Sequence, residues 1–344
     1  MNFTNYLNSS GKEIDREIKD IFSNLNKDIG FSTNKLNALS RLFFDHTKGG
    51  KKIRGILIKF GFQLAANSIN PEILKIGAAF EILHTSLLIH DDIIDKSDLR
   101  RGKKCIYKTL GGNHYGISQA ICLGDLGFFL AIDSISQSGF DSDLKNSAIA
   151  FLTQTMINTA AGQMLDIEFS NKQSARNEKD VLLIHKLKTA SYSFIAPLSI
   201  GFILGGGNIG MLSVIKEFGE KLGIAFQIQD DILGSFGNEK DIGKPTYSDI
   251  EEGKNTLLIT YAAKNASSAQ RKVLDKYYGR GKISKQAFEQ LLSVFTTTES
   301  LQYSIGMAEK YALNAKDIIP TLSNNPEMQE FLKQLTDLAV SRKK

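Results

Sequence analysis

The sequence EILHTSLLIHDDIIDKSDLRRG, residues 81–102, joins a strongly apolar stretch to a cluster of charges. Asp91 and Asp95 are four residues apart, which places both carboxylates on one face of a helix, and Asp92 flanks them. Like charges at this spacing repel one another in an isolated helix. The stretch therefore predicts a buried helix whose end carries acids that need a positive partner, such as a divalent cation.

The apolar part of this stretch has helical periodicity. Over residues 72–90, apolar side chains such as Ile73, Ile76, Phe80 and Leu83 recur at steps of three and four. Similar patterns predict further helices at residues 12–28, 35–46, 51–67, 114–137, 142–169, 178–204, 210–233, 248–264, 283–296, 299–318 and 327–341. No sustained alternation of period two is present, so we expect an all-α protein of about a dozen helices.

The composition restricts the class of function. The chain of 344 residues has 42 basic and 37 acidic residues, a net charge of +5, which suits an anionic small molecule and does not require nucleic acid. Two cysteines make no disulfide framework, so we expect a reducing, cytoplasmic setting. The most apolar run, residues 194–207, is too short to span a bilayer, so we expect no integral membrane segment.

A second acidic pair ends another apolar helix. The sequence LGIAFQIQDDILG, residues 222–234, contains Asp230 and Asp231. Either acidic motif alone is weak evidence, because surface helices often carry several acids. Two such helices facing one another would hold Mg²⁺ between two walls of carboxylates, and Mg²⁺ commonly binds one or two carboxylates together with substrate phosphates. The pair therefore predicts a cavity for a polyphosphate ligand.

Basic residues next to glycine turns or acidic helix ends would complete such a cavity. Lysine binds phosphate as a point charge, whereas arginine can form two parallel hydrogen bonds to it. The candidates are Lys51, Arg54, Arg100, Arg101, Lys188 and Lys244. Each one alone is more often a solvated surface charge, so the prediction depends on their association with the acidic motifs.

Six motifs in order now resemble those of one family. They are GGKKIR (49–54), the opening stretch (81–102), GQMLD (162–166), KLKTAS (186–191), FQIQDDILG (226–234) and GKPTYSDIEEGKNT (243–256). Together they resemble the trans-isoprenyl diphosphate synthases of the polyprenyl synthetase family, over roughly residues 40–265. The resemblance implies a single domain over residues 1–344, an isoprenoid synthase bundle around a central cavity.

The resemblance also assigns roles. It implies that Mg²⁺, about three ions per site, binds Asp91, Asp95 and Asp230, with support from Asp92 and Asp231. It implies that an allylic diphosphate is held by Arg100, Lys188 and Lys244, and that isopentenyl diphosphate is held by Lys51, Arg54, His84 and Arg101. It also implies that Thr189 and Gln227 line the reacting carbons and that Lys254 helps close the site. The implied reaction is head-to-tail condensation in a homodimer.

Product length depends in this family on the side chains before the first acidic motif. Leu83, Ser86 and Leu87 would form the floor of a tunnel, and Phe128 and Phe129 are candidates for a deeper stop. Because Ser86 is small, we expect a product of twenty carbons or more.

Two departures and three alternatives remain. Gly234 stands where many members have a third acid, and Gly55 where proline is common. A class I terpene cyclase and a non-catalytic subunit of a heteromeric synthase are alternatives. Glu81 and His84 also match the Glu-x-x-His spacing of di-iron bundles, although no second copy exists, and His84 is otherwise a buried core histidine.

Overall fold

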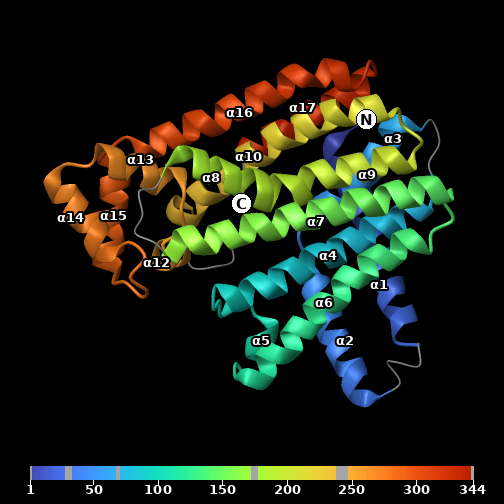
Figure 1. Cartoon of the computed structure of the whole chain (residues 1–344), viewed down its shortest axis with the longest axis horizontal. Helices are drawn as coiled ribbons and strands as arrows, with labels where there is room; N and C mark the ends of the chain where they lie inside the picture. Colours follow the sequence, from blue (N-terminus) through green and yellow to red (C-terminus); the bar gives the residue numbers. More distant parts are fainter. Residues whose placement is uncertain (1, 28–32, 67–69, 172–176, 238–246, 342–344) are drawn as a thin grey trace. The chain divides into compact units, whose positions relative to one another are not determined.

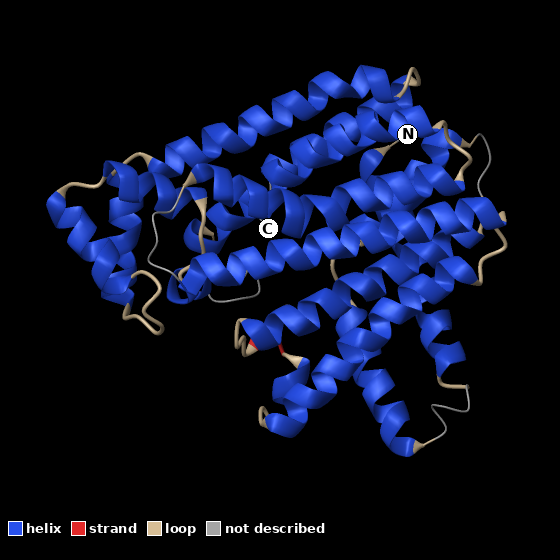
Figure 2. Ribbon diagram, in the orientation of Figure 1, coloured by secondary structure: helices blue, strands red, loops and turns tan. Residues whose placement is uncertain are grey.

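The computed structural model is almost entirely helical (Figure 2), which confirms the predicted all-α class. It describes residues 2–27, 33–66, 70–171, 177–237 and 247–341. The predicted phosphate ligand Lys244 lies outside these residues. Among the described residues, the only strands are β1 (Leu99–Arg100) and β2 (Lys103–Lys104), which pair antiparallel directly after the first acidic motif.

The helices form two compact units. The first unit comprises Met1–Gln154 and Ala196–Ile215. It contains α1 (Phe3–Leu25), α2 (Asn34–Thr47), α3 (Ile53–Ala65), α4 (Glu72–Ile94), α5 (Ile106–Thr109), α6 (His114–Ser136), the first part of α7 (Ser142–Asn171), α9 (Ala196–Leu204) and η3, a 3₁₀ turn (Ile209–Met211).

The second unit comprises Thr155–Ile195 and Lys216–Lys344. It contains the rest of α7, α8 (Glu178–Ile184), η2 (His185–Ile195), α10 (Leu212–Phe236, which begins in the first unit), α12 (Ser248–Glu252), α13 (Leu257–Asn265), α14 (Ser268–Tyr277), α15 (Lys285–Thr297), α16 (Ser300–Leu322) and α17 (Pro326–Ser341). The prediction of a single domain stays a prediction.

Short polar side chains start many of these helices. Thr33 accepts a hydrogen bond from the Leu36 amide at the start of α2, and Asn113 caps α6 in the same way. Ser267 and Gln270 form a reciprocal capping box at the start of α14. Such caps satisfy amide donors that have no partner inside the helix. The chain thus sets its helix starts locally.

The helix α4 is the central element of the first unit, where it packs against α1, α3 and α6 (Figure 1). Side chains on all of its faces are buried, including Ile76, Phe80 and Leu83. A helix that is apolar all round is covered on every side. The first acidic motif therefore extends from a rigid, buried support.

The structure corrects several predicted boundaries. The first helix begins at Phe3, whereas the pattern predicted residue 12. The predicted helix at 248–264 is broken into α12 and α13, because Gly253 adopts a left-handed conformation, with φ of 73°. The helix α14 was not predicted, since its sequence is strongly polar.

Three stretches are long and apolar enough to cross a membrane by length and composition. They are Glu72–Ile94, His114–Ser136 and Glu178–Leu204, and their most apolar windows are 72%, 33% and 78% buried within the protein. Protein therefore covers most of the first and third windows, whereas much of α6 is accessible. The prediction that no segment is integral to a membrane stays a prediction.

Candidate active site

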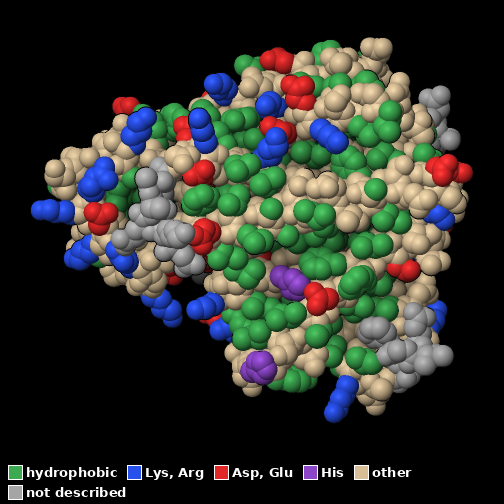
Figure 3. Space-filling view, viewed as in Figure 1, with side chains coloured by type: hydrophobic (Ala, Val, Ile, Leu, Met, Phe, Trp, Pro, Cys, Tyr) green, Lys and Arg blue, Asp and Glu red, His purple; other side chains and the backbone are tan. Residues whose placement is uncertain are grey.

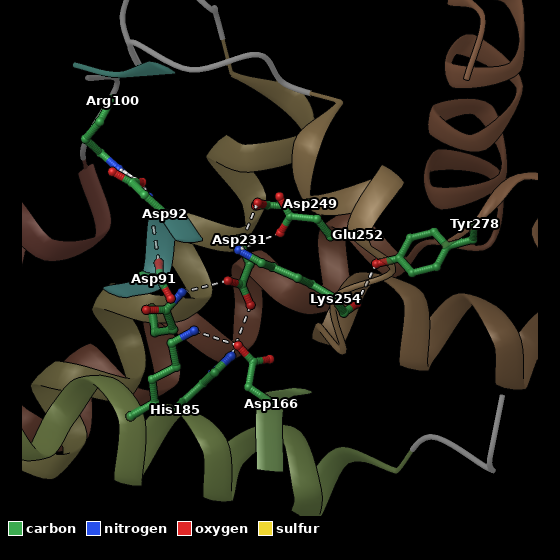
Figure 4. Close-up of polar contacts among 12 residues, drawn as sticks. Asp91, Asp92, Arg100, Asp166, His185, Asp231, Asp249, Glu252, Lys254 and Tyr278 are labelled. Carbon is green, nitrogen blue, oxygen red and sulfur yellow. Dashed lines mark hydrogen bonds and ion pairs between the residues drawn. The ribbon is translucent and has the colours of Figure 1, made fainter. Parts of the chain in front are cut away.

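The first acidic motif lies at the C-terminal end of α4. Asp91 belongs to the last turn, and Asp95 is the C-cap, whose amide donates to the Asp91 carbonyl over 2.8 Å. Both residues are partly exposed, whereas Asp92 is only 4% exposed. Arg100 on β1 turns back onto the motif (Figure 4), and its Nη2 lies 3.7 Å from Asp91 Oδ2. Arg100 therefore lies against Asp91 and Asp92, and the predicted roles of these residues stay predictions.

Asp92 is held by protein donors. The Arg100 Nε donates to Asp92 Oδ1 over 2.8 Å, and Nη2 donates to the same oxygen. Burial raises the pKa of Asp92, and the positive charge of Arg100 opposes the rise. This arrangement suits a residue that positions Arg100, and it leaves Asp91 and Asp95 as the more accessible oxygen donors.

Several cations converge on His84, which is 8% exposed. Burial and then the positive charges of Arg54, Arg101 and Arg100 hold the pKa of His84 well below its usual 6.5. The guanidinium groups around this neutral imidazole repel one another, and a bound anion would offset that repulsion. The cluster is therefore suited to binding an anion. The structure thus brings together three of the predicted isopentenyl diphosphate ligands.

The turn before α3 is fixed by a buried lysine that the sequence did not single out. Lys52 is 4% exposed, has φ of 51°, and donates to the carbonyls of Thr47 (2.5 Å) and Gly49 (2.8 Å). It also pairs with Asp15 of α1 at 3.3 Å. Lys52 therefore orders the turn that presents the exposed Lys51.

Glu81 has a structural partner. Its Oε1 accepts a hydrogen bond of 3.0 Å from the Gly55 amide in the first turn of α3. A carboxylate at a helix N-terminus is favourable, because the free amides there carry partial positive charge. This contact explains why Glu81 is buried without invoking a di-iron site.

The residues predicted to set product length lie at the contact between α4 and α6. Ser86 is fully buried, and a Cβ added at Gly127 would meet Ser86 Oγ at 1.9 Å. Leu83 is also buried, so of the three predicted residues Leu87 alone is partly exposed. Phe129 is 69% exposed, so it does not line the interior of a single chain. The expectation that Phe129 closes an interior tunnel is therefore not supported.

The second unit carries Lys188 and Thr189 on η2, which has π-helical geometry over its eleven residues. The helix α7 approaches η2 closely at Gly162, where a Cβ would lie 2.4 Å from the Lys188 amide nitrogen. This approach brings Asp166 to Lys188, with Oδ2 and Nζ 2.6 Å apart. Gly162 and Asp166 are the first and last residues of GQMLD. The structure therefore explains both ends of this motif: the glycine allows the close approach of the two helices, and the aspartate pairs with Lys188.

A chain of hydrogen bonds joins η2 to the second acidic motif on α10. Thr189 Oγ1 donates to Gln227 Oε1 over 2.7 Å, and Gln227 Nε2 donates to Asp231 Oδ1 over 2.8 Å. The other oxygen of Asp231 lies 3.0 Å from His185 Nε2 (Figure 4). The predicted pair of Thr189 and Gln227 is thus in direct contact. Both Asp231 oxygens have protein partners, whereas Asp230 is partly exposed.

The missing third acid of the second motif has a spatial replacement. A Cβ added at Gly234 would meet Asp249 Oδ2 at 2.0 Å, so the carboxylate of α12 occupies the place of a side chain at position 234. Asp249 is 6% exposed and pairs with Lys254, whose Nζ lies 3.5 Å from Asp249 Oδ1 and 3.2 Å from Glu252 Oε2. The departure at Gly234 therefore removes no carboxylate from this region.

Sequence reasoning missed four residues of these two clusters, namely Lys52, Asp166, His185 and Asp249. Lys52, Asp166 and Asp249 lie inside quoted motifs, and His185 directly precedes one, so motif membership was the available signal. Their partners could not be read from the sequence, because Asp166 and Lys188 come from separate helices.

The polyprenyl synthetase family model matches residues 36–295. The geranylgeranyl diphosphate synthase of Sulfolobus acidocaldarius is 33% identical over 99% of both chains. The chain belongs to the polyprenyl synthetase family. The geranylfarnesyl diphosphate synthase of Aeropyrum pernix is 31% identical over 86% of this chain and 91% of that protein.

The fold of this polyprenyl synthetase family member is also found among solved structures. A geranylgeranyl pyrophosphate synthase from Corynebacterium glutamicum, complexed with isoprenyl diphosphate and magnesium, matches with a TM-score of 0.91 and 23% identity. The match covers 99% of this chain and 100% of that chain. The predicted isoprenoid synthase bundle is thereby confirmed.

Proposed function

We propose that this protein is a trans-prenyltransferase that condenses isopentenyl diphosphate with an allylic diphosphate, giving a polyprenyl diphosphate of twenty carbons or more. Family membership supports the reaction class. The names of two relatives, a geranylgeranyl and a geranylfarnesyl diphosphate synthase, support the product range. The observation that carries the proposal is the group of cations around buried His84, next to an acidic motif with two accessible carboxylates.

The cations suit a diphosphate that is bound without metal ions. Arg54 and Arg101 offer forked donors, and His84 remains neutral and supplies one further hydrogen bond. The exposed Lys51 and the ordered turn beside it add a point charge. Isopentenyl diphosphate does not ionise in this reaction, so a site of fixed positive charge is sufficient to hold it.

The acidic residues suit Mg²⁺ bound together with the allylic diphosphate. In the described part of the chain, no three His, Cys, Asp or Glu side chains lie close enough to hold a metal ion by themselves. Mg²⁺ commonly takes one or two carboxylates and completes its shell with phosphate oxygens and water. Asp91, Asp95 and Asp230 would hold it, and bound Mg²⁺ would neutralise charge that develops on the leaving diphosphate.

The remaining chemistry belongs to side chains of the second unit. Loss of diphosphate leaves an allylic cation, and oxygen atoms of Thr189 and Gln227 offer it partial negative charge. Thr189 is 7% exposed, which limits the access of water that would convert the cation into an alcohol. The double bond of isopentenyl diphosphate then attacks the cation, and the released diphosphate accepts the proton whose loss completes the new double bond.

A product assay tests this function. Purified protein is incubated with Mg²⁺, isopentenyl diphosphate and, in separate tubes, starters of five, ten, fifteen or twenty carbons, and the dephosphorylated alcohols are sized. We expect a discrete product of twenty carbons or more. Cyclic hydrocarbon products would favour a terpene cyclase, and a folded protein that extends no starter would favour a non-catalytic subunit.

Substitution at Leu87 is expected to shorten the product. Ser86 packs too tightly against Gly127 for a larger side chain, and overpacking there would cost about 1–3 kcal/mol. Leu87 has accessible surface, so the Leu87→Phe variant can hold its ring without displacing α6. We expect products shorter by at least one five-carbon unit, measured by chromatography of the alcohols. The matched variant Leu88→Phe should keep the wild-type length, and equal shortening in both variants would contradict the role of Leu87.

We also propose that the protein is a cytoplasmic homodimer. On α6, Tyr115, Ile121 and Phe129 are exposed, and hydrophobic side chains are abundant on the face that carries this helix (Figure 3). Exposed apolar patches mark sites for protein or membrane contact. Sedimentation should give twice the chain mass of 38.0 kDa, and Phe129→Asp should shift the protein toward monomer. A monomeric wild type that co-sediments with lipid vesicles would instead favour a membrane contact.

A further inference from the structure

The hydrogen bonds around Asp231 have only one possible direction. An aspartate carboxylate accepts hydrogen bonds and donates none. Gln227 must therefore turn its NH₂ group toward Asp231 Oδ1, at 2.8 Å, and His185 must carry its proton on Nε2, at 3.0 Å from Oδ2. The amide oxygen of Gln227 then faces Thr189, whose hydroxyl must donate to it over 2.7 Å. Asp231 thus sets the orientation of every group in the chain.

His185 is an unusual residue for its surroundings. The residue is 3% exposed, and Nδ1 is buried with no hydrogen-bond partner among the described residues. A buried polar atom without a partner costs about 1–3 kcal/mol. A leucine or methionine would fill this space without that cost. Stability therefore does not explain a histidine here, whereas its Nε2 contact with Asp231 does.

We propose that His185 is a positioning residue for the condensation: its Nε2–H anchors Asp231, which holds the Gln227 amide with its oxygen toward Thr189 and so keeps both oxygens aimed at the reacting carbons. This inference rests on the proposed function. It goes beyond that function because it gives His185 and Asp231 the role of orienting the uncharged oxygens of Gln227 and Thr189.

The arrangement explains why a carboxylate and an imidazole are both needed. Without His185, the Asp231 side chain keeps only Gln227 as a partner at this end and can rotate about its Cα–Cβ bond. Rotation of Asp231 would allow the Gln227 amide to turn over, which would place NH₂ hydrogens where the oxygen had been. Hydrogens with partial positive charge would repel an allylic cation. We therefore expect the chemical step to be affected more than substrate binding.

Two variants separate this role from a packing role. His185→Leu removes the donor, whereas His185→Gln retains an N–H that can reach Asp231. In His185→Leu we expect kcat to fall roughly 10–100-fold with little change in either KM, and a larger share of allylic diphosphate to be released as alcohol. His185→Gln should recover most of the kcat. Equal losses in both variants, or a wild-type kcat in folded His185→Leu, would overturn the inference.

A spectroscopic measurement tests the same inference without turnover. Nitrogen-15 NMR of the histidine side chains in the unmodified protein should show His185 as the Nε2–H tautomer. The resonance is assigned by its loss in His185→Gln, and exposed His114, replaced by Gln, is the matched control. An Nδ1–H tautomer would overturn the inference even if the protein elongates prenyl chains. Absence of elongation in wild type would instead count against the proposed function, and the tautomer would still decide the geometry.

Discussion

In the Asp91→Asn variant we expect kcat to fall by about 1,000-fold, the scale seen when one charge-stabilising group is removed from an active site. Asparagine keeps the size of the side chain and removes its negative charge. The loss should therefore reflect weaker binding of Mg²⁺ beside the diphosphate, with little change in folding, because Asp91 is only partly buried. The measurement is kcat at increasing Mg²⁺ concentration, and higher Mg²⁺ should restore part of the activity.

The matched control for this prediction is Asp98→Asn. Asp98 lies in the same stretch of sequence, but its side chain is 73% exposed and pairs with Lys108 at 2.8 Å. We expect this variant to retain turnover within a few-fold of wild type. Asp230→Asn, in the second acidic motif, should resemble Asp91→Asn. Near-normal turnover of both motif variants would remove these acids from the metal site.

The second large effect is expected at Gly234, where the Gly234→Asp variant introduces the third acid that the resemblance led us to expect. The new Cβ would lie 2.0 Å from Asp249 Oδ2, so two carboxylates would compete for one buried position. We expect a loss of roughly 2–4 kcal/mol in the free energy of unfolding, by overpacking and by burial of like charges. Turnover should fall as well, because Asp249 can no longer pair with Lys254. Urea denaturation and kcat measure the two effects.

A double variant distinguishes this explanation from a general effect of substituting a helical glycine. Gly234→Asp combined with Asp249→Gly leaves one carboxylate in the same region, and should be more stable than the sum of the two single changes predicts. Gly306→Asp on α16 is the control, because nothing lies within 4 Å of a Cβ at that position. Simple additivity of the two changes would contradict the proposed replacement of the third acid by Asp249.

Much of this fold was predictable because its signals are local. Helical periodicity around Phe80 and the polar caps at Thr33 and Asn113 depend on residues a few positions apart. The proximity of the acidic motif and Arg100 was also predictable, since Arg100 follows Asp92 by only eight positions. Local sequence is therefore sufficient to place helices and to propose which of their ends are charged.

The remaining features depend on contacts between distant residues. Asp231 and His185 are 46 residues apart, and no spacing rule joins them. Gly234 looked like a lost acid, because the sequence does not reveal that α12 returns the Asp249 carboxylate to that place. Helix α14 was missed for a different reason: its buried surface is small, with Leu274 its only buried residue. Sequence patterns alone do not reveal contacts between residues that are far apart in the chain.

The π-helical geometry of η2 has a consequence for how this segment tolerates changes in length. A helix with wider turns accommodates more residues over the same rise than an α-helix does, so it is sensitive to the number of residues as well as their kind. Deletion of one residue between Leu187 and Phe194 would favour return to α-helical turns, so the flanking helices could keep their places while residues within η2 changed direction. Lys188 would then turn relative to Gly162, whose close approach fixes α7 at this point. Point substitutions on the outer face of η2 should be tolerated, whereas a single-residue deletion should leave the fold and redirect the side chains that η2 presents.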